Sequence, residues 1–140
     1  RGLGDVYKRQ VKLDAKKADN KNKRWQTIAE SAAKQSKRTV IPVIRPLMNW
    51  KEALELAKTL DVVLVPYENE RGMEATREII GHITPGQSIG IFIGPEGGFS
   101  EEEITGLPDE MHRISLGRRI LRTETAGLAT LAMLVYQLDE

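Results

Sequence analysis

A short apolar run, Ile89–Ile93, leads without a spacer into the glycine-rich segment Gly94–Ser100, GPEGGFS. The run predicts a buried strand, and the glycines predict a tight turn from that strand into a helix. Glycine adopts backbone angles that other residues resist, and it has no Cβ to block a close contact. In open α/β sheets, ligands bind where such loops leave the carboxyl ends of the strands. The segment therefore predicts either a simple tight turn or a backbone cradle for a polar, nucleoside-like ligand.

The glycine spacing argues against a phosphate cradle. It matches neither the dinucleotide-binding fingerprint nor the phosphate-binding loop, because the chain has no G-x-G-x-x-G and no G-K-[ST]. The Glu96 carboxylate would also repel a phosphate. Pro66-Tyr67-Glu68 is another candidate segment, and it also follows an apolar run. It is either a plain strand exit or a further part of the same site.

The second unusual segment is Leu116–Ala126, LGRRILRTETA, in which Arg118, Arg119 and Arg122 lie between a predicted strand and a predicted helix. One interpretation is a solvated basic loop. The other is a ligand site, because the planar guanidinium group suits phosphate oxygens or a developing oxyanion. Since Arg122 adjoins a helix that is expected in the core, we expect its exposure to solvent to be limited.

Strands and helices alternate along the sequence, which predicts a parallel α/β sheet. Two capping boxes are predicted, Asn49 with Glu52 and Ser100 with Glu103. The last predicted helix is apolar on nearly every side and is expected to be buried. Pro42 interrupts the first predicted strand, which favours an edge or bent strand. The predicted strands are 40–44, 61–66, 89–93 and 111–116, and the predicted longer helices are 22–35, 49–59, 74–82 and 124–138.

Composition excludes several classes of protein. The chain has 140 residues, enough for one domain, and it has no cysteine and only two histidines. A disulfide framework, a cysteine nucleophile and a thiolate or zinc site are therefore not expected, and no metal is predicted. No apolar run is long enough to span a membrane and no secretory signal is visible, so we expect a cytoplasmic protein without membrane contacts. Residues 1–10 lack an initiator Met and an amphipathic period, so they are interpreted as a ragged or foreign segment ahead of a domain over 11–140.

Charge is divided unevenly along the chain. Residues 1–51 contain fourteen Lys/Arg and four Asp/Glu, whereas residues 52–140 contain seven and sixteen. This asymmetry indicates either attraction of the first part to a polyanion or a lysine-rich solvated surface.

Together, the two loop motifs resemble a known family. The pattern I-G-P-E-G-G-F-S-x-x-E, followed by S-L-G-x-R-I-L-R-x-E-T-A, is similar to the RsmE family of the SPOUT superfamily. These bacterial methyltransferases modify N3 of a uridine in 16S ribosomal RNA. The segment Arg24–Ser36 is also similar to that family, so the resemblance covers about residues 11–138.

The resemblance implies a fold, a methyl donor and partners. The fold would be a parallel sheet flanked by helices, with a trefoil knot at its C-terminal end. The donor S-adenosylmethionine would be held mainly by backbone groups, the protein would be a homodimer, and its RNA partner would be 16S rRNA within the small ribosomal subunit. The cofactor-binding residues implied are Pro66, Gly94, Pro95, Glu96, Gly97, Gly98, Leu116, Gly117, Ile120 and Leu121.

Catalytic roles also follow from the resemblance. Arg122 would stabilise negative charge on the uracil or hold an adjacent phosphate, and Glu124 would orient Arg122 unless it only caps the helix. Arg118 and Arg119, with the basic first part of the chain, would contact RNA phosphates. The pattern identifies no general base.

The chain departs from the family at its start. Family members usually begin with a β-barrel domain similar to the PUA RNA-binding module, followed by the first strand and helix of the catalytic domain. Neither part is visible in this sequence. The sequence is therefore interpreted as an N-terminally truncated methyltransferase domain. Three alternatives remain: a catalytically silent cofactor- or RNA-binding fragment, a SPOUT methyltransferase acting on another RNA, and a nonmethylating α/β enzyme that binds a phosphorylated metabolite.

Overall fold

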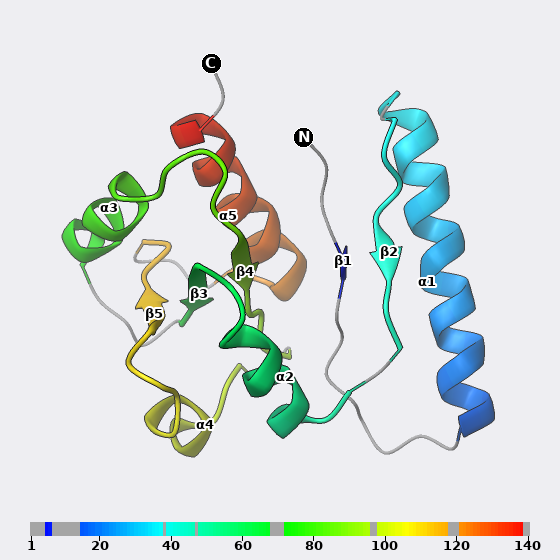
Figure 1. The fold of residues 1–140 in the computed structure, drawn as a ribbon, viewed down its shortest axis with the longest axis horizontal. Helices are drawn as coiled ribbons and strands as arrows, with labels where there is room; N and C mark the ends of the chain where they lie inside the picture. The colour runs from blue at the N-terminus through cyan, green and yellow to red at the C-terminus, as the bar shows by residue number, and fades with distance from the viewer. Residues whose placement is uncertain are drawn as a thin grey trace. The chain divides into compact units, whose positions relative to one another are not determined.

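The computed structural model describes residues 5–6, 15–37, 39–46, 48–67, 72–95, 98–117 and 121–138. The chain divides into two compact units, Arg1–Leu56 and Ala57–Glu140, with helix α2 (Trp50–Ala57) at the boundary between them. Strands and helices alternate in both units (Figure 1). The predicted α/β class is confirmed.

The first unit is built around two short parallel strands, β1 (Asp5–Val6) and β2 (Val43–Ile44), with helix α1 (Ala15–Gln35) between them in sequence. β2 is shorter than the predicted strand and begins directly after Pro42, which has no N–H to give to a strand ladder. β1 was not predicted, because two residues are too few to show a period of alternation.

The side chain of Gln26 joins α1 to β2 within this unit. Its Nε2 donates a hydrogen bond to the carbonyl oxygen of Pro42 at 3.0 Å, and its Oε1 accepts one from the backbone N–H of Ile44 at 2.7 Å. One amide group therefore satisfies two backbone groups beside this short strand, where few strand partners exist.

The second unit contains a three-stranded parallel sheet in the order β4-β3-β5, formed by β3 (Val62–Pro66), β4 (Ile89–Ile91) and β5 (Met111–Ile114). Helix α3 (Met73–Gly81) follows β3, α4 (Glu101–Thr105) follows β4, and α5 (Thr123–Leu138) follows β5. The parallel sheet flanked by helices is confirmed, and each strand lies within the range predicted for it.

The core of the second unit lies between the sheet and two helices. α3 contacts both β5 and α5. The buried side chains that pack together there are Leu64, Ile80, Ile83, Ile114 and Leu134. Val63 and Val65 on the other face of β3 are also buried, at 3% and 0% exposure. Burial on both faces explains why β3 has no apolar–polar alternation in the sequence.

Helix caps agree with the sequence. Ser100 Oγ accepts a hydrogen bond from the Glu103 N–H, and the Glu103 carboxylate accepts one from the Ser100 N–H, so the predicted capping box of α4 is confirmed. Asn49 Oδ1 accepts from the Glu52 N–H at 2.8 Å ahead of α2. These bonds satisfy N–H groups that have no partner within the helix.

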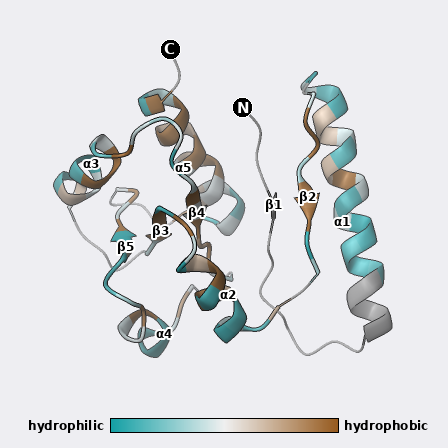
Figure 2. Ribbon diagram, viewed as in Figure 1, coloured by the Kyte–Doolittle hydropathy of each residue, from teal (hydrophilic) through white to brown (hydrophobic). Residues whose placement is uncertain are grey.

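The prediction that the last helix is buried is wrong for the single chain. α5 packs Leu134 and Thr130 inward, but Leu128, Val135 and Tyr136 are 68%, 54% and 90% exposed. Figure 2 shows brown, apolar residues along α5. The physical reason is that a helix apolar on all sides needs partners on all sides, whereas the sheet and α3 cover only one.

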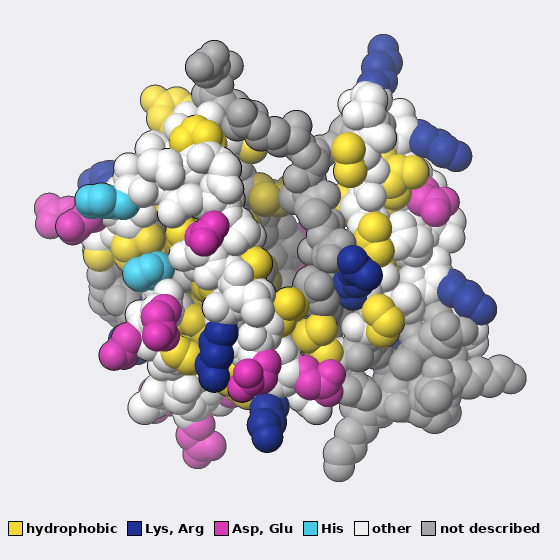
Figure 3. All heavy atoms as spheres, viewed as in Figure 1, with side chains coloured by type: hydrophobic (Ala, Val, Ile, Leu, Met, Phe, Trp, Pro, Cys, Tyr) yellow, Lys and Arg dark blue, Asp and Glu magenta, His cyan; other side chains and the backbone are white. Residues whose placement is uncertain are grey.

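The charge asymmetry appears on the molecular surface. In the view of Figure 3, Lys and Arg side chains project from α1, whereas acidic side chains interspersed with some Lys and Arg lie over the second unit. Lys21, Arg24 and Lys34 on α1 are all exposed. Within the described residues, no helix combines the length and the apolar composition needed to cross a membrane.

Candidate functional site

Three strand exits lie side by side at one edge of the sheet. In the strand register, Pro66 at the end of β3 pairs with Ile114, and Leu64 pairs with Ile91 at the end of β4. The next N–H groups continue the pairing: Tyr67 N donates to the Ile114 oxygen at 3.1 Å, and Phe92 N donates to the Leu64 oxygen at 2.9 Å. Neighbouring strands lie about 4.8 Å apart, so the exits of β4 and β5 lie roughly 10 Å apart across that of β3.

The loop after β4 folds tightly on itself. A Cβ on Gly94 would lie 3.0 Å from the backbone nitrogen of Phe99 and 3.1 Å from the carbonyl carbon of Gly98. Gly98 has a φ of 75°, and its N–H donates to the Pro95 oxygen at 2.7 Å. At Gly94, therefore, the missing Cβ makes room for the turn itself.

Gly117, after β5, differs from Gly94. Its φ is +110°, and a Cβ built there meets no heavy atom of the described residues within 4 Å. The N–H of Gly117 donates a hydrogen bond to Ser115 Oγ at 3.2 Å. A left-handed backbone with open space beside it is a position where a ligand can approach the main chain closely.

The start of α5 lies against the loop after β4. Thr123 Oγ1 donates a hydrogen bond to the carbonyl oxygen of Gly94 at 3.2 Å. A Cβ on Gly127, one turn further on, would lie 3.9 Å from Ile93 Cγ1. Arg122 directly precedes Thr123, and its carbonyl oxygen accepts the first helical bond from Ala126 N at 2.8 Å. The backbone of Arg122 therefore belongs to the same edge of the sheet as the glycine turn.

The expected limited exposure of Arg122 is wrong for the single chain. The side chains of Arg122 and Glu124 are both exposed, and the structure shows no ion pair between these two described residues. The reason is that α5 buries only one face, so its first turn is covered on one side only. The Arg122 guanidinium group is therefore accessible to a large partner in solution.

The other predicted site residues divide into two groups. Pro66, Leu116 and Leu121 are half-buried and apolar, whereas Pro95 is exposed. Glu96, Gly97, Arg118, Arg119 and Ile120 lie outside the described residues. The structure therefore brings the exits of β3, β4 and β5 together with the start of α5.

One residue at this edge was missed by sequence reasoning. Thr76 on α3 is 1% exposed, and its hydroxyl makes two hydrogen bonds to the backbone of Ser115, immediately after β5. A threonine within a helical pattern carries no signal of such a contact, because its partner is 39 residues away in sequence.

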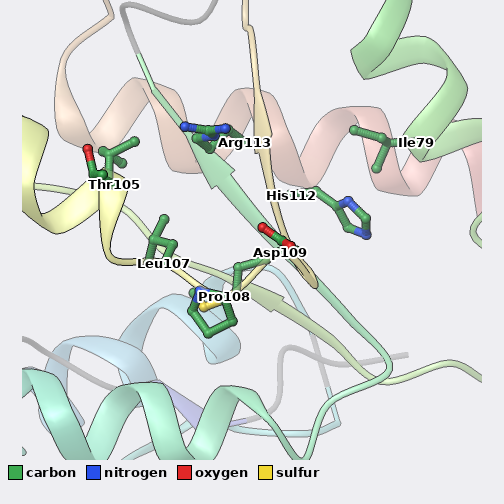
Figure 4. Close-up of a pocket in the computed structure, with 9 residues that line it drawn as sticks. Ile79, Thr105, Leu107, Pro108, Asp109, His112 and Arg113 are labelled. Atoms are coloured by element: carbon green, nitrogen blue, oxygen red, sulfur yellow. The ribbon is translucent and has the colours of Figure 1, made fainter.

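A separate hollow of about 270 Å³ lies at the other end of β5. Figure 4 shows side chains around it from α3, from α4, from the segment that enters β5 and from β5 itself, among them Ile79, Thr105 and His112. None of the predicted site residues that the structure describes lines it. It opens near the start of β5, whereas the glycine-marked loops leave the carboxyl ends of the strands.

Comparison with known proteins identifies the class. Residues 6–135 match a family described as the RNA methyltransferase domain, and the chain belongs to that family. More particularly, it is 38% identical over 133 residues to the ribosomal RNA small subunit methyltransferase E of Bacillus subtilis, covering 92% of this chain and 52% of that protein. It is 40% identical over 111 residues to the same-named protein of Mesomycoplasma hyopneumoniae, covering 79% of this chain and 46% of that protein. The predicted resemblance is confirmed.

Solved structures agree. A ribosomal RNA small subunit methyltransferase E from Neisseria gonorrhoeae, bound to S-adenosyl methionine, superposes with a TM-score of 0.74 at 31% identity, over 96% of this chain and 53% of that one. A putative methyltransferase from Legionella pneumophila, also in complex with that molecule, gives 0.72 at 29% identity, over 96% of this chain and 54% of that one. The chain spans about half the length of the curated relatives it matches.

Proposed function

We propose that this chain carries the donor-binding and catalytic part of an enzyme that uses S-adenosylmethionine to methylate N3 of a uridine in 16S ribosomal RNA. The names of its relatives and the donor bound in two structural neighbours support this proposal. The observation that carries it is the meeting of three strand exits at one edge, with the open backbone of Gly117 among them.

The residues at this edge fit the proposed donor. When bound, S-adenosylmethionine supplies an electrophilic methyl group on a sulfonium centre. The half-buried apolar residues Pro66, Leu116 and Leu121 suit its adenosyl part, and Gly117 has no side chain of its own to block the approach of a ligand to its main chain. Gly94 and Gly98 belong to the loop after β4, with Glu96 and Gly97 between them in sequence. Ile120, after β5, completes the proposed set of donor-binding residues.

Arg122 is the proposed catalytic residue. A uracil becomes negatively charged when N3 loses its proton, and a guanidinium group held beside it stabilises that charge. Arg122 is exposed at the same edge as the glycine turn, so it can meet an RNA base presented from solvent. Glu124 is proposed to orient Arg122 once RNA is bound, and Arg118 and Arg119 to contact phosphates.

We also propose that the chain forms a homodimer through α5 and that the loops after β4 and β5 belong to a trefoil knot of the SPOUT type. The exposed apolar side chains Leu128, Val135 and Tyr136 support the dimer, because soluble proteins rarely leave such a helix face in water. The knot rests on the family resemblance alone.

The alternative is a fragment that binds the donor without turnover. It is favoured by one observation, that the chain covers only about half of its relatives' length. RNA selection in the full-length relatives can then depend on the part that has no counterpart here.

A methyl-transfer assay with labelled S-adenosylmethionine and small ribosomal subunits tests the proposal. The unmodified chain should transfer label to 16S RNA, and Arg122→Ala should lower the rate about 100-fold or more while donor affinity changes less than about twofold. Arg77→Ala, which removes an exposed arginine of α3, is the matched control and should leave both quantities unchanged. Equal rates for Arg122→Ala and the unmodified chain would remove the assignment. Donor binding without transfer by the unmodified chain would favour the alternative.

A further inference from the structure

We propose that Thr76 is a positioning residue for the methyl-donor site, because its buried hydroxyl fixes the backbone where β5 passes into the loop that carries Gly117. The inference rests on the proposed function, since it assigns Thr76 a role toward the donor. Thr76 hydrogen-bonds Ser115, which is outside the proposed set of donor-binding residues, and it acts through that residue.

The contact has the geometry of a missing strand partner. Thr76 Oγ1 accepts a hydrogen bond from Ser115 N at 2.9 Å and donates one to the Ser115 oxygen at 3.0 Å. The preceding residue, Ile114, directs its carbonyl oxygen toward β3, where Tyr67 N donates to it. Successive residues of a strand point their backbone groups to opposite sides, so those of Ser115 point away from the sheet. One hydroxyl on α3 satisfies both of them.

Burial makes this contact costly to lose. Thr76 is 1% exposed and Ser115 is 3% exposed, so water does not readily replace the hydroxyl. A buried backbone N–H and C=O left without partners are strongly unfavourable, and the chain would shift to expose or re-pair them. The shift would fall on the residues that directly follow β5.

A short chain of hydrogen bonds carries this constraint to Gly117. Ser115 is held through its backbone by Thr76, and its own Oγ accepts a hydrogen bond from Gly117 N at 3.2 Å. Gly117 has a φ of +110°, with open space beside its Cα. Thr76 therefore fixes the direction in which the main chain of Leu116 and Gly117 faces a ligand.

Two substitutions separate the hydroxyl from the packing. Thr76→Val keeps the shape of the side chain and removes both hydrogen bonds, whereas Thr76→Ser keeps the hydroxyl. Thr130→Val is the matched control: Thr130 is 0% exposed, and its Oγ1 donates to the Ala126 oxygen within its own helix α5, at 2.8 Å.

The measurements are the Kd for S-adenosylmethionine by calorimetry and the exchange rates of the Ser115 and Gly117 amide hydrogens. Thr76→Val should raise the Kd about tenfold and accelerate exchange at both amides. Thr76→Ser and Thr130→Val should bind the donor as the unmodified chain does. Circular dichroism verifies that each variant is folded.

A folded Thr76→Val that binds the donor with unchanged Kd would overturn the inference. If Thr76→Val does not fold, Ser115→Ala takes its place, because it removes the hydroxyl that joins Ser115 to the N–H and the carbonyl oxygen of Gly117 and leaves the backbone groups bound by Thr76 in place. It should raise the Kd about threefold, and an unchanged Kd would again overturn the inference. Failure of the unmodified chain to bind S-adenosylmethionine is a different result, which would overturn the proposed function itself.

Discussion

At the exit of β5, Gly117 combines a φ of +110° with open space where a side chain would begin. Gly86, in the turn ahead of β4, has a φ of +92° and equally open space. A left-handed backbone of this kind strains any residue with a Cβ, by about 1–3 kcal/mol. Substitution of either glycine should therefore strain the backbone to a similar degree. The two differ in position, because Gly117 follows the carboxyl end of a strand and Gly86 precedes the amino end of one.

This pair gives a prediction at the scale of single residues. Gly117→Ala and Gly86→Ala should lower the free energy of unfolding by similar amounts, about 1–3 kcal/mol each, measured in urea. Only Gly117→Ala should weaken S-adenosylmethionine binding, by about tenfold, because its Cβ enters the space proposed for the ligand. Equal affinities in the two variants would show that the space beside Gly117 is not used.

At the scale of elements, α5 contributes to both the proposed donor site and the proposed dimer interface. Its first residue, Thr123, bonds the glycine turn through the Gly94 oxygen, and its later turns expose Leu128, Val135 and Tyr136. The helix thus holds one loop of the proposed donor site and also presents the apolar face proposed for the dimer. Pairing of two chains through this face would cover surface that a single chain leaves in water.

A charge on that face tests the proposed dimer. Val135→Glu should weaken self-association at least about tenfold, because a carboxylate cannot be buried in an apolar contact without a partner. Sedimentation equilibrium measures the association constant. Ala75→Glu, on the exposed surface of α3, is the control and should leave it unchanged. Two variants that associate equally well would exclude this face of α5 from the interface.

At the scale of the whole molecule, the uneven distribution of charge is the feature with a functional consequence. Lys21, Arg24 and Lys34 are exposed on α1 in a unit rich in basic residues, whereas acidic residues dominate the second unit. Contacts between such cations and phosphates release counterions, which makes RNA binding depend on salt. On the proposed function, we infer that these cations of α1 contribute to the affinity of the chain for RNA.

The prediction concerns the slope of log affinity against log salt concentration for 16S RNA. Replacing Lys21, Arg24 and Lys34 together by Gln should reduce the magnitude of that slope by roughly 2–3, because each lost phosphate contact removes about 0.7–0.9. Fluorescence anisotropy over a salt series measures it. Arg77→Gln should change the slope little, and an unchanged slope in the triple variant would argue against a role for α1.

Local sequence predicted the parts of this fold that depend on local forces. The apolar run Val62–Val65 predicted the buried central strand, because burial on both faces removes alternation. Ser100 with Glu103 predicted the start of α4, because the box is closed by residues three apart. The positions of the glycine-marked loops at one edge of the sheet followed from the alternation of strands and helices.

What the sequence did not predict depends on distant partners. The bonds from Thr76 to Ser115 join residues 39 apart, and no local pattern marks them. The strand β1 is too short to show a period. The exposure of Arg122 and of the outer face of α5 was wrongly predicted. The apolar composition of α5 indicates that the helix needs packing partners on all sides, but it does not show whether those partners come from the same chain.

We propose above that the exits of β3, β4 and β5 form one site for S-adenosylmethionine. Titration of the donor into isotope-labelled protein, followed by amide NMR shifts, tests it most directly. We expect the perturbed amides to gather at Tyr67, Gly94, Gly98, Leu116 and Gly117. Perturbations that gather instead around the hollow lined by Leu107 and His112, with the amides at the strand exits unchanged, would contradict it.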